Sequence, residues 1–328
     1  MRRSRANRLR TGLLALPVSA LPFLAYGQWT PQGRHLVDEL RVAMAPPQLP
    51  TLDAATRAEA RALAPSYEGH VLPLVYHGVG SEADGDGGTA VSPDRFAEHL
   101  AVLEAAGMHF VTAQQVADAF AGGPPLPPNA VLITFDDGRA DAVLWATPLL
   151  RDAGARATMF VITDSTDRGG PYYATWGDLD HDVWDLQAHT AALHDEQPTG
   201  DGPLPMLTSL AAGESLGDWR ARVREDLDRA DAALEEHTGR RPVAFAYPFG
   251  AWGGDRANDR SIDVLLGMEL ATRYRLAFHQ DDQDEMTLAG PEVWPLGLRR
   301  LEVGDWSGTE LLQRIDEAAA RTAATGAR

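Results

Sequence analysis

Residues 131–138 read VLITFDDG, an apolar run that ends in two adjacent acids and a glycine. Such a run predicts a buried strand, and the carboxyl ends of strands carry the active site in parallel α/β folds. The neighbouring carboxylates of Asp136 and Asp137 repel each other unless a cation or a proton separates them. This arrangement suggests that one acid binds a metal and the other acts as a base. The alternative is a solvated turn that caps the following helix.

Short apolar runs alternate with helical patterns on both sides of this strand. The helices have clear start signals, such as Ser92 before Pro93 and the capping boxes that begin at Thr112 and Ser307. Strands and helices that alternate in this way predict a parallel sheet, closed as a barrel or doubly wound. We expect strands at residues 70–76, 108–111, 130–135, 157–162, 244–247, 274–278 and 297–303. A further strand would end at His189.

A second polar feature is the pair His189 and His194, within the stretch WDLQAHTAALH at 184–194. Histidines at this spacing lie about 140° apart around an ideal helix and on opposite faces of a strand. The chain must therefore turn between them if both rings bind one ion. Taken alone, the spacing is more often chance than ligation. Together with one carboxylate, however, two histidines make a three-ligand site that leaves positions open for water and substrate.

Composition excludes several classes of protein. The chain has 328 residues and a formal net charge of −18, whereas a nucleic-acid-binding protein needs a basic patch to pair with phosphates. The chain contains no cysteine, which rules out disulfides, thiolate zinc sites and cysteine nucleophiles. Any metal must therefore be held by His, Asp or Glu. The 44% share of hydrophobic residues is typical of a globular protein.

The N-terminus resembles an export signal. Arginines crowd the first ten residues and precede an apolar run at 11–27. This run is shorter than the roughly 20 residues of a membrane helix and contains two prolines, which favours a cleaved signal peptide over a membrane anchor. Either way, we expect the protein outside the cytoplasmic membrane, secreted or anchored to its outer face, with membrane contact only through this segment. Proline-punctuated residues 28–66 predict a linker or stalk, and residues 67–328 have about the length of one α/β barrel domain.

Several motifs resemble those of a known family. The stretch TFDDG at 134–138 looks like the first motif of the polysaccharide deacetylases, the NodB-homology proteins of carbohydrate esterase family 4. The His-Thr pair at 189–190 looks like the second motif. The histidine spacing and the stretches LPLVYH at 72–77 and AYPFG at 246–250 are similar to the poly-β-1,6-N-acetylglucosamine deacetylase branch. The resemblance runs from about residue 70 to about residue 303. It implies a distorted, incomplete (β/α) barrel of the NodB-homology type.

The same resemblance implies roles for the polar residues. Asp137, His189 and His194 would be the metal ligands, and Asp136 the general base that takes a proton from the attacking water. The expected cofactor is a divalent metal, Zn²⁺ before Co²⁺ or Ni²⁺. Such a metal polarises the acetamide carbonyl and lowers the pKa of water.

The third motif departs from the family pattern. Phe249 stands where the family has a tyrosine, but the family's oxyanion contact is a backbone N–H, which Phe249 retains. Tyr247, in the same motif, is assigned with it to the substrate side of the site. Ala246 replaces the arginine that orients the base in the family. Arg299 and Arg300 are candidates for its job, although surface charge is the interpretation we favour for both.

Two histidines are candidates for the general acid. The family's usual acid is a histidine late in the chain, but the surroundings of His279 do not match that motif. His77 follows the first strand and resembles the histidine that the poly-N-acetylglucosamine branch uses, so we favour His77. Trp176, Trp184 and Trp294 are candidates for sugar-stacking walls or for core residues.

The sequence thus predicts a metal-dependent N-deacetylase that releases acetate from an acetylated amino-sugar polysaccharide of the poly-N-acetylglucosamine kind. The same chemistry on peptidoglycan, chitin or O-acetylated xylan is the nearest alternative. A second alternative is an inactive barrel that binds wall polysaccharide. Only the alanine at position 246, where the family has an arginine, favours it. A glycosidase would place two carboxylates about 5 to 9.5 Å apart across a sugar ring and needs no paired histidines.

Overall fold

A computed structural model of the chain describes residues 30–80, 90–200, 202–254, 256–280 and 286–325. The expected export segment at 1–27 lies outside the described residues. Within the described ranges, no helix combines the length and the apolar character that crossing a membrane requires.

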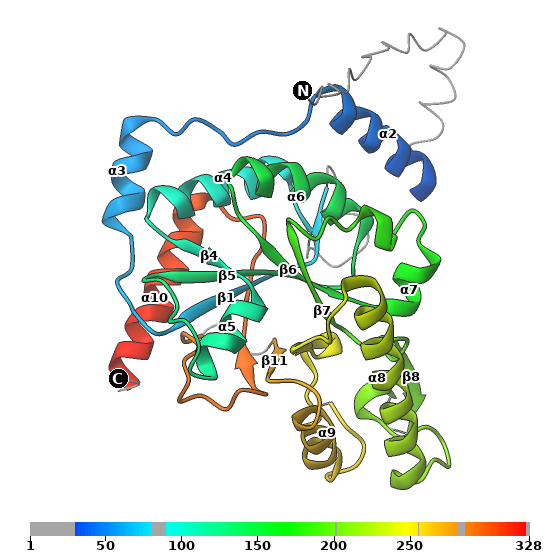
Figure 1. The fold of residues 1–328 in the computed structure, drawn as a ribbon. Helices are drawn as coiled ribbons and strands as arrows, with labels where there is room; N and C mark the ends of the chain where they lie inside the picture. Colours follow the sequence, from blue (N-terminus) through cyan, green and yellow to red (C-terminus); the bar gives the residue numbers. More distant parts are fainter. Residues whose placement is uncertain (1–29, 81–89, 201, 255, 281–285, 326–328) are drawn as a thin grey trace, which may run out of the picture.

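A parallel sheet forms the centre of the molecule (Figure 1). Its strands lie in the order β12-β11-β10-β7-β6-β5-β1-β13, and β4 pairs with β5 beside this path. Every residue of β1 and β5 is buried, as expected for strands covered on both faces. The strands are β1 (Val71–Tyr76), β4 (His109–Val111), β5 (Ala130–Phe135), β6 (Ala157–Val161), β7 (Trp184–Ala188), β10 (Ala244–Ala246), β11 (Leu276–His279), β12 (Leu298–Arg299) and β13 (Leu301–Glu302).

The last two strands bring the two ends of the sheet together. Strand β12 pairs with β11, while β13 pairs with β1 at the opposite end of the strand order. Only Arg300 separates β12 from β13, so one short segment touches both edges without joining them by a continuous ladder. The single strand expected at 297–303 is therefore divided in two. The sheet is a nearly closed (β/α) barrel with one open seam, which confirms the predicted fold class.

Helices surround this barrel (Figure 1). All three predicted helix starts are present: the Ser92 side chain accepts from the N–H of Arg95, and the segments after Thr112 and Ser307 begin with capping-box hydrogen bonds. The helices are α4 (Pro93–Ala105), α5 (Ala113–Phe120), α6 (Ala140–Asp152), α7 (Thr163–Arg168), α8 (Leu216–Thr238), α9 (Ile262–Ala271) and α10 (Gly308–Thr325).

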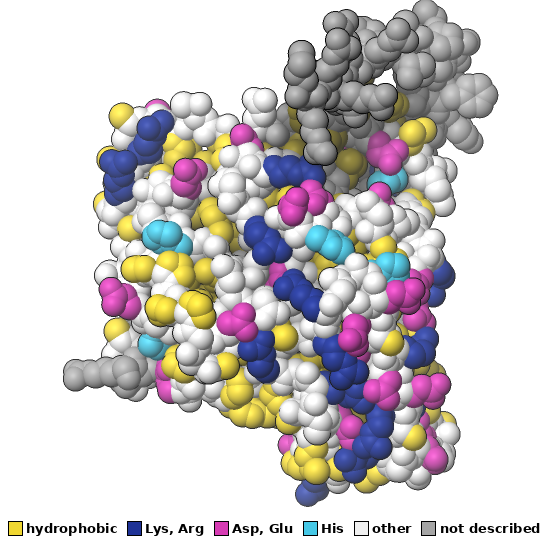
Figure 2. All heavy atoms as spheres, viewed as in Figure 1, with side chains coloured by type: hydrophobic (Ala, Val, Ile, Leu, Met, Phe, Trp, Pro, Cys, Tyr) yellow, Lys and Arg dark blue, Asp and Glu magenta, His cyan; other side chains and the backbone are white. Residues whose placement is uncertain are grey.

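Helix α8 is tied to its neighbours by charge as well as by packing. Its apolar stripe, which includes Trp219 and Leu227, is fully buried. On its polar faces, Arg220 and Arg224 pair with Glu269 of α9. Basic and acidic side chains are interspersed where α8 lies at the lower right of the molecule (Figure 2).

The segment expected to be a linker folds against the barrel. It contains α2 (Pro31–Met44) and α3 (Ala54–Ala62), and α3 packs on α4 and α10. Ala60 of α3 is part of the main hydrophobic core. Between the helices, the N–H of Leu49 donates to the carboxylate of Asp152 in α6. The described part of this segment is thus packed on the domain, and the domain boundary at residue 67 stays a prediction.

Short elements complete the fold. Trp184 packs edge-on against Phe135, and its indole N–H donates to Thr147 of α6, so this tryptophan is a core residue between the sheet and that helix. The short elements are β2 (Gly78–Val79), β3 (Ala90–Val91), β8 (Glu196–Thr199), β9 (Gly202–Pro205) and the 3₁₀ turns η2 (Trp176–Asp178), η3 (Met206–Thr208) and η4 (Pro248–Gly250).

Candidate active site

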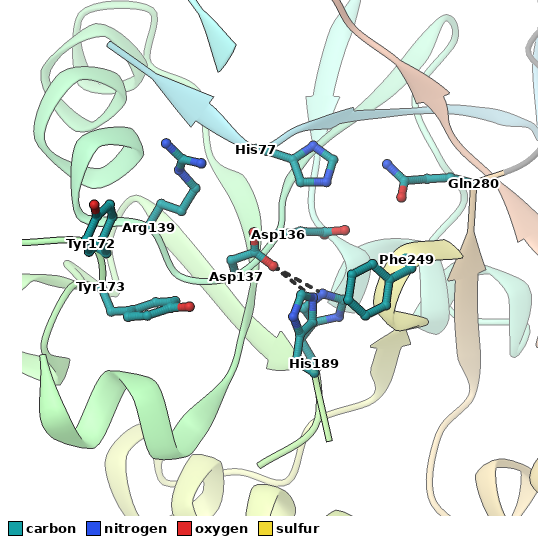
Figure 3. Close-up of a pocket in the computed structure, with 10 residues that line it drawn as sticks. His77, Asp136, Asp137, Arg139, Tyr172, Tyr173, His189, Phe249 and Gln280 are labelled. Carbon is teal, nitrogen blue, oxygen red and sulfur yellow. Dashed lines mark ion pairs between the residues drawn. The ribbon is translucent and has the colours of Figure 1, made fainter. Parts of the chain in front are cut away.

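A cavity of about 360 Å³ opens at the carboxyl ends of the barrel strands (Figure 3). His77 follows β1, Asp136 and Asp137 follow β5, His189 follows β7, and Gln280 follows β11. This is the end of a parallel barrel at which active sites form. The other lining residues are Arg139, Tyr172, Tyr173, His194 and Phe249.

The three residues predicted as metal ligands lie together in this cavity. The Oδ1 atom of Asp137 is 3.5 Å from Nε2 of His189 and 3.1 Å from Nε2 of His194 (dashed lines in Figure 3). One ligand atom from each residue lies within 4.8 Å of the others. The turn that the histidine spacing requires is present, because β7 ends at Ala188 and Thr190 adopts a left-handed φ of 69°.

The hydrogen bonds of His189 suit a metal ligand. Its Nδ1 lies 2.8 Å from the carbonyl oxygen of Ala246, which can only accept, so Nδ1 carries the proton. In the neutral ring the lone pair is then on Nε2, the atom that faces Asp137. Two imidazole nitrogens and one carboxylate form the mixed donor set that Zn²⁺ and similar ions bind with positions left open. The residues present therefore fit a divalent cation.

Electrostatics favour the charged form of Asp137. Burial alone would raise the pKa of its carboxyl, but the neighbouring His189 and His194 outweigh burial and hold this pKa well below its ordinary value. Conversely, burial would lower the pKa of His194, and the Asp137 carboxylate raises it overall. Asp137 is thus an anion at neutral pH and available as a ligand.

Asp136 is paired with a buried arginine. Its two carboxylate oxygens each accept from a guanidinium nitrogen of Arg300 at 2.6 Å, and the exposed fractions are 2% for Asp136 and 0% for Arg300. Arg300 also donates to Thr134 in β5. Burial would raise the pKa of Asp136, but the charge of Arg300 lowers it below its ordinary value. Asp136 is therefore held ionised and in one orientation.

This pair corrects the interpretation of Arg300 as surface charge. Arg300 lies in the seam between β12 and β13, so its side chain enters the barrel beside the end of β5. Arg300 is thus the guanidinium partner of Asp136, a partner that Ala246 cannot provide. Arg299 is half-buried in β12 and is not among the residues that line the cavity.

Only one of the two candidate acids lines the cavity. His77 faces it from the end of β1, on the side opposite His189 (Figure 3). His279 is buried at the end of β11, where its Nε2 lies 3.2 Å from the carbonyl oxygen of Gly297. The structure therefore brings His77, and not His279, to Asp136 and Asp137.

The third motif contributes Phe249 to the cavity but not Tyr247. The Phe249 ring stacks on His194 with ring centres 5.0 Å apart. Tyr247 is buried, its hydroxyl donates to the carbonyl of Leu296, and its ring packs against Phe245. Tyr247 is therefore not among the residues that line the cavity. Alternation along the strand places it on the same face as Phe245, which points into the core.

Backbone strain concentrates in this site. Among the described residues, four that are not glycine have a positive φ, and three of them are Asp137, Thr190 and Phe249. Such conformations cost about 1–3 kcal/mol each and persist where the surrounding structure fixes them. They place the Asp137 carboxylate, the turn between His189 and His194, and the Phe249 ring beside His194.

Sequence reasoning missed three residues on one wall of the cavity. Tyr172, Tyr173 and Arg139 lie together on the side opposite Phe249 (Figure 3). Tyr172 has 59% of its surface exposed, although large aromatic side chains are usually covered. Their only signal in the sequence was a tyrosine pair after the Gly-Gly-Pro stretch at 169–171.

None of the three candidate tryptophan walls lines this cavity. Trp184 is in the core, Trp176 stacks on His237, and Trp294 lines a separate groove beside α5.

The fold and the site together define a barrel protein in which an Asp-His-His group that fits a cation lies next to a buried, ionised carboxylate. Residues 123–269 match the family model described as polysaccharide deacetylase. The matched residues, which include Asp136, Asp137, His189 and His194, therefore resemble a polysaccharide deacetylase.

Comparison with individual proteins agrees with this assignment. The poly-β-1,6-N-acetyl-D-glucosamine N-deacetylase of Escherichia coli K12 is 26% identical over 210 residues, which cover 56% of this chain and 31% of that protein. The chain thus spans about a third of the length of this curated relative. Two solved structures share the fold. A de-N-acetylase from Aggregatibacter actinomycetemcomitans has a TM-score of 0.62 at 20% identity, covering 74% of this chain and 99% of that one. IcaB from Ammonifex degensii has a TM-score of 0.59 at 24% identity, covering 75% and 97%.

Proposed function

We propose that this chain is a metal-dependent N-deacetylase that removes acetyl groups from an amino-sugar polysaccharide of the poly-N-acetylglucosamine kind. One observation carries the proposal: Asp137, His189 and His194 gather in one cavity beside the buried carboxylate of Asp136. The named activity of the E. coli relative supports the substrate class. The Arg300–Asp136 pair weakens the alternative of an inactive barrel, because it supplies the guanidinium whose loss at Ala246 had favoured that alternative.

In this proposal, Asp137, His189 and His194 hold a divalent cation, with Zn²⁺ preferred over Co²⁺ or Ni²⁺. Such a cation supplies Lewis acidity, which polarises the acetamide carbonyl and lowers the pKa of an attacking water. The ionised state of Asp137 and the unprotonated Nε2 of His189 match this role.

The remaining steps belong to side chains and backbone of this domain. Asp136, held ionised by Arg300, accepts the proton of the water that attacks the carbonyl carbon. The backbone N–H of Phe249 donates to the oxyanion that forms. His77 gives a proton to the amine nitrogen as the C–N bond breaks, so that acetate and a free amine result.

The N-terminal segment supports a proposal for the location of the site. We propose that residues 1–27 export the chain, as a cleaved signal or as an anchor, and that residues 67–328 are the catalytic domain. The site would then face an extracellular polysaccharide, and the membrane would be contacted only through the N-terminal segment. The negative net charge fits a partner other than nucleic acid.

Acetate release from a panel of acetylated polymers tests the proposed substrate. We expect the highest rate on poly-β-1,6-N-acetylglucosamine and lower rates on chitin, peptidoglycan and O-acetylated xylan. A higher rate on one of the other three polymers would identify that polymer as the substrate instead. Release from none of them would contradict the proposed activity.

A separate prediction concerns His77. If His77 protonates the departing amine, His77→Ala should reduce turnover of an N-acetyl substrate by about 10²- to 10⁴-fold, with metal content unchanged. An acetate ester with a good leaving group should be affected much less, because its leaving oxygen needs no proton. His279→Ala, measured on the same two substrates, is the control. An amide-selective loss in His279→Ala and not in His77→Ala would show that the late histidine is the acid.

A further inference from the structure

A carboxylate outside the cavity holds the segment between the two metal-site histidines. Asp226 of α8 is 3% exposed and is not one of the residues that line the cavity. Its Oδ1 accepts from the backbone N–H of Ala191 at 2.9 Å, and its Oδ2 accepts from the N–H of Ala192 at 2.7 Å. One side chain therefore fixes two consecutive peptide groups between His189 and His194.

The carbonyl groups of the same turn are held from the other side. The oxygen of Thr190 accepts from the N–H of Thr163 at 3.2 Å, and the oxygen of Ala191 accepts from the N–H of Asp164 at 3.1 Å. Arg229 bridges the two acids, with Nη1 2.9 Å from Oδ2 of Asp164 and Nη2 3.4 Å from Oδ2 of Asp226. Helices α7 and α8 thus fasten the turn together.

The turn needs such a fastening. Thr190 is β-branched and has a φ of 69°, a conformation that costs free energy for any residue other than glycine. If the turn relaxed, His194 would move away from Asp137, whose Oδ1 is now 3.1 Å from its Nε2. Metal sites tolerate only small displacements, of about 0.2 Å, from their preferred ligand distances.

We infer that Asp226 is a positioning residue of the metal site: it fixes the turn at residues 190–192 and thereby sets His189 and His194 around one cation. The inference rests on the proposed function of the cavity as a metal centre. A carboxylate suits this role because both of its oxygens accept. An asparagine would accept from one N–H and present its own NH₂ group to the other.

The affinity for Zn²⁺, measured by competition with a chromophoric chelator, tests this inference. Asp226→Asn is expected to bind Zn²⁺ about 10- to 100-fold more weakly than the wild-type protein, the usual effect of losing an outer hydrogen bond around a metal site. Asp231→Asn is the matched control, since Asp231 lies on the same helix and is also 3% exposed. Its carboxylate accepts from the Tyr274 hydroxyl at 2.7 Å, away from the turn, so Zn²⁺ affinity should stay at the wild-type value.

Wild-type affinity in Asp226→Asn would overturn the inference. An equal loss in both variants would also overturn it, because that result would reflect a general loosening of α8. Circular dichroism in the presence of chelator shows whether each variant is folded. If Asp226→Asn does not fold, Arg229→Gln takes its place, because Arg229 is half-exposed and links Asp226 to Asp164. Weaker binding by Arg229→Gln supports the inference, and unchanged binding overturns it. A wild-type protein that binds no Zn²⁺ would instead contradict the proposed function itself.

Discussion

Asp136→Asn is expected to lower deacetylase turnover by about 10²- to 10⁴-fold while the protein keeps its metal. The amide has the shape of the carboxylate and can still accept from Arg300, but it cannot take a proton from water. Asp137→Asn is expected to lose metal and activity together, because Asp137 is the carboxylate that both histidines face. Atomic absorption of the purified variants gives the metal content, and acetate release gives the rate.

These two neighbouring substitutions control for each other. Both remove one negative charge after β5 and leave the side-chain volume unchanged. Equal metal loss in the two variants would show that the roles of ligand and base are assigned wrongly. Wild-type turnover in Asp136→Asn would remove Asp136 from the mechanism altogether.

Arg300→Met is expected to lower the free energy of unfolding by about 3–5 kcal/mol. The substitution replaces the charged arginine side chain with the apolar side chain of methionine. It leaves the Asp136 carboxylate charged, buried and without its strongest partner. The double variant Asp136→Asn/Arg300→Met should recover part of this loss, because no buried charge is then left unpaired. Urea unfolding in the presence of chelator measures the free energy without a contribution from bound metal.

An exposed pair provides the control for this measurement. Arg241 and Glu235 form an ion pair in which both side chains are well exposed, so Arg241→Met should change stability by less than about 1 kcal/mol. If Arg300→Met were as mild as Arg241→Met, the Arg300–Asp136 pair would not be the buried support of the base that the geometry describes.

The strands and helix starts could be predicted from sequence because their signals are local. The apolar run before Asp136 forms β5 with every residue buried, and Ser92 and Thr112 cap the helices that follow them. The division of the stretch at 297–303 could not be predicted in this way. Its two halves pair with opposite ends of the sheet, and which edge each half meets depends on how the whole barrel closes.

The site shows the same limit. Asp137, His189 and His194 stand in recognisable motifs, whereas Arg300 reaches Asp136 across 164 positions of the chain and has no motif of its own. The role of Asp226, 35 positions after Ala191, could not be predicted either, because no sequence motif marks a buried acid in a helix whose partners lie elsewhere in the chain. The resemblance of a motif does not state on which face of the strand a side chain lies, and Tyr247 is buried against Phe245 instead of lining the cavity.

Acetate release from poly-β-1,6-N-acetylglucosamine by the protein before chelation, after chelation and after reloading tests the central claim most directly. We expect no release once the metal is removed, and release restored by Zn²⁺, Co²⁺ or Ni²⁺, since Asp137, His189 and His194 form a donor set that suits these ions. Undiminished release by the metal-free protein would contradict the account, because Asp136 and His77 alone would then suffice for hydrolysis.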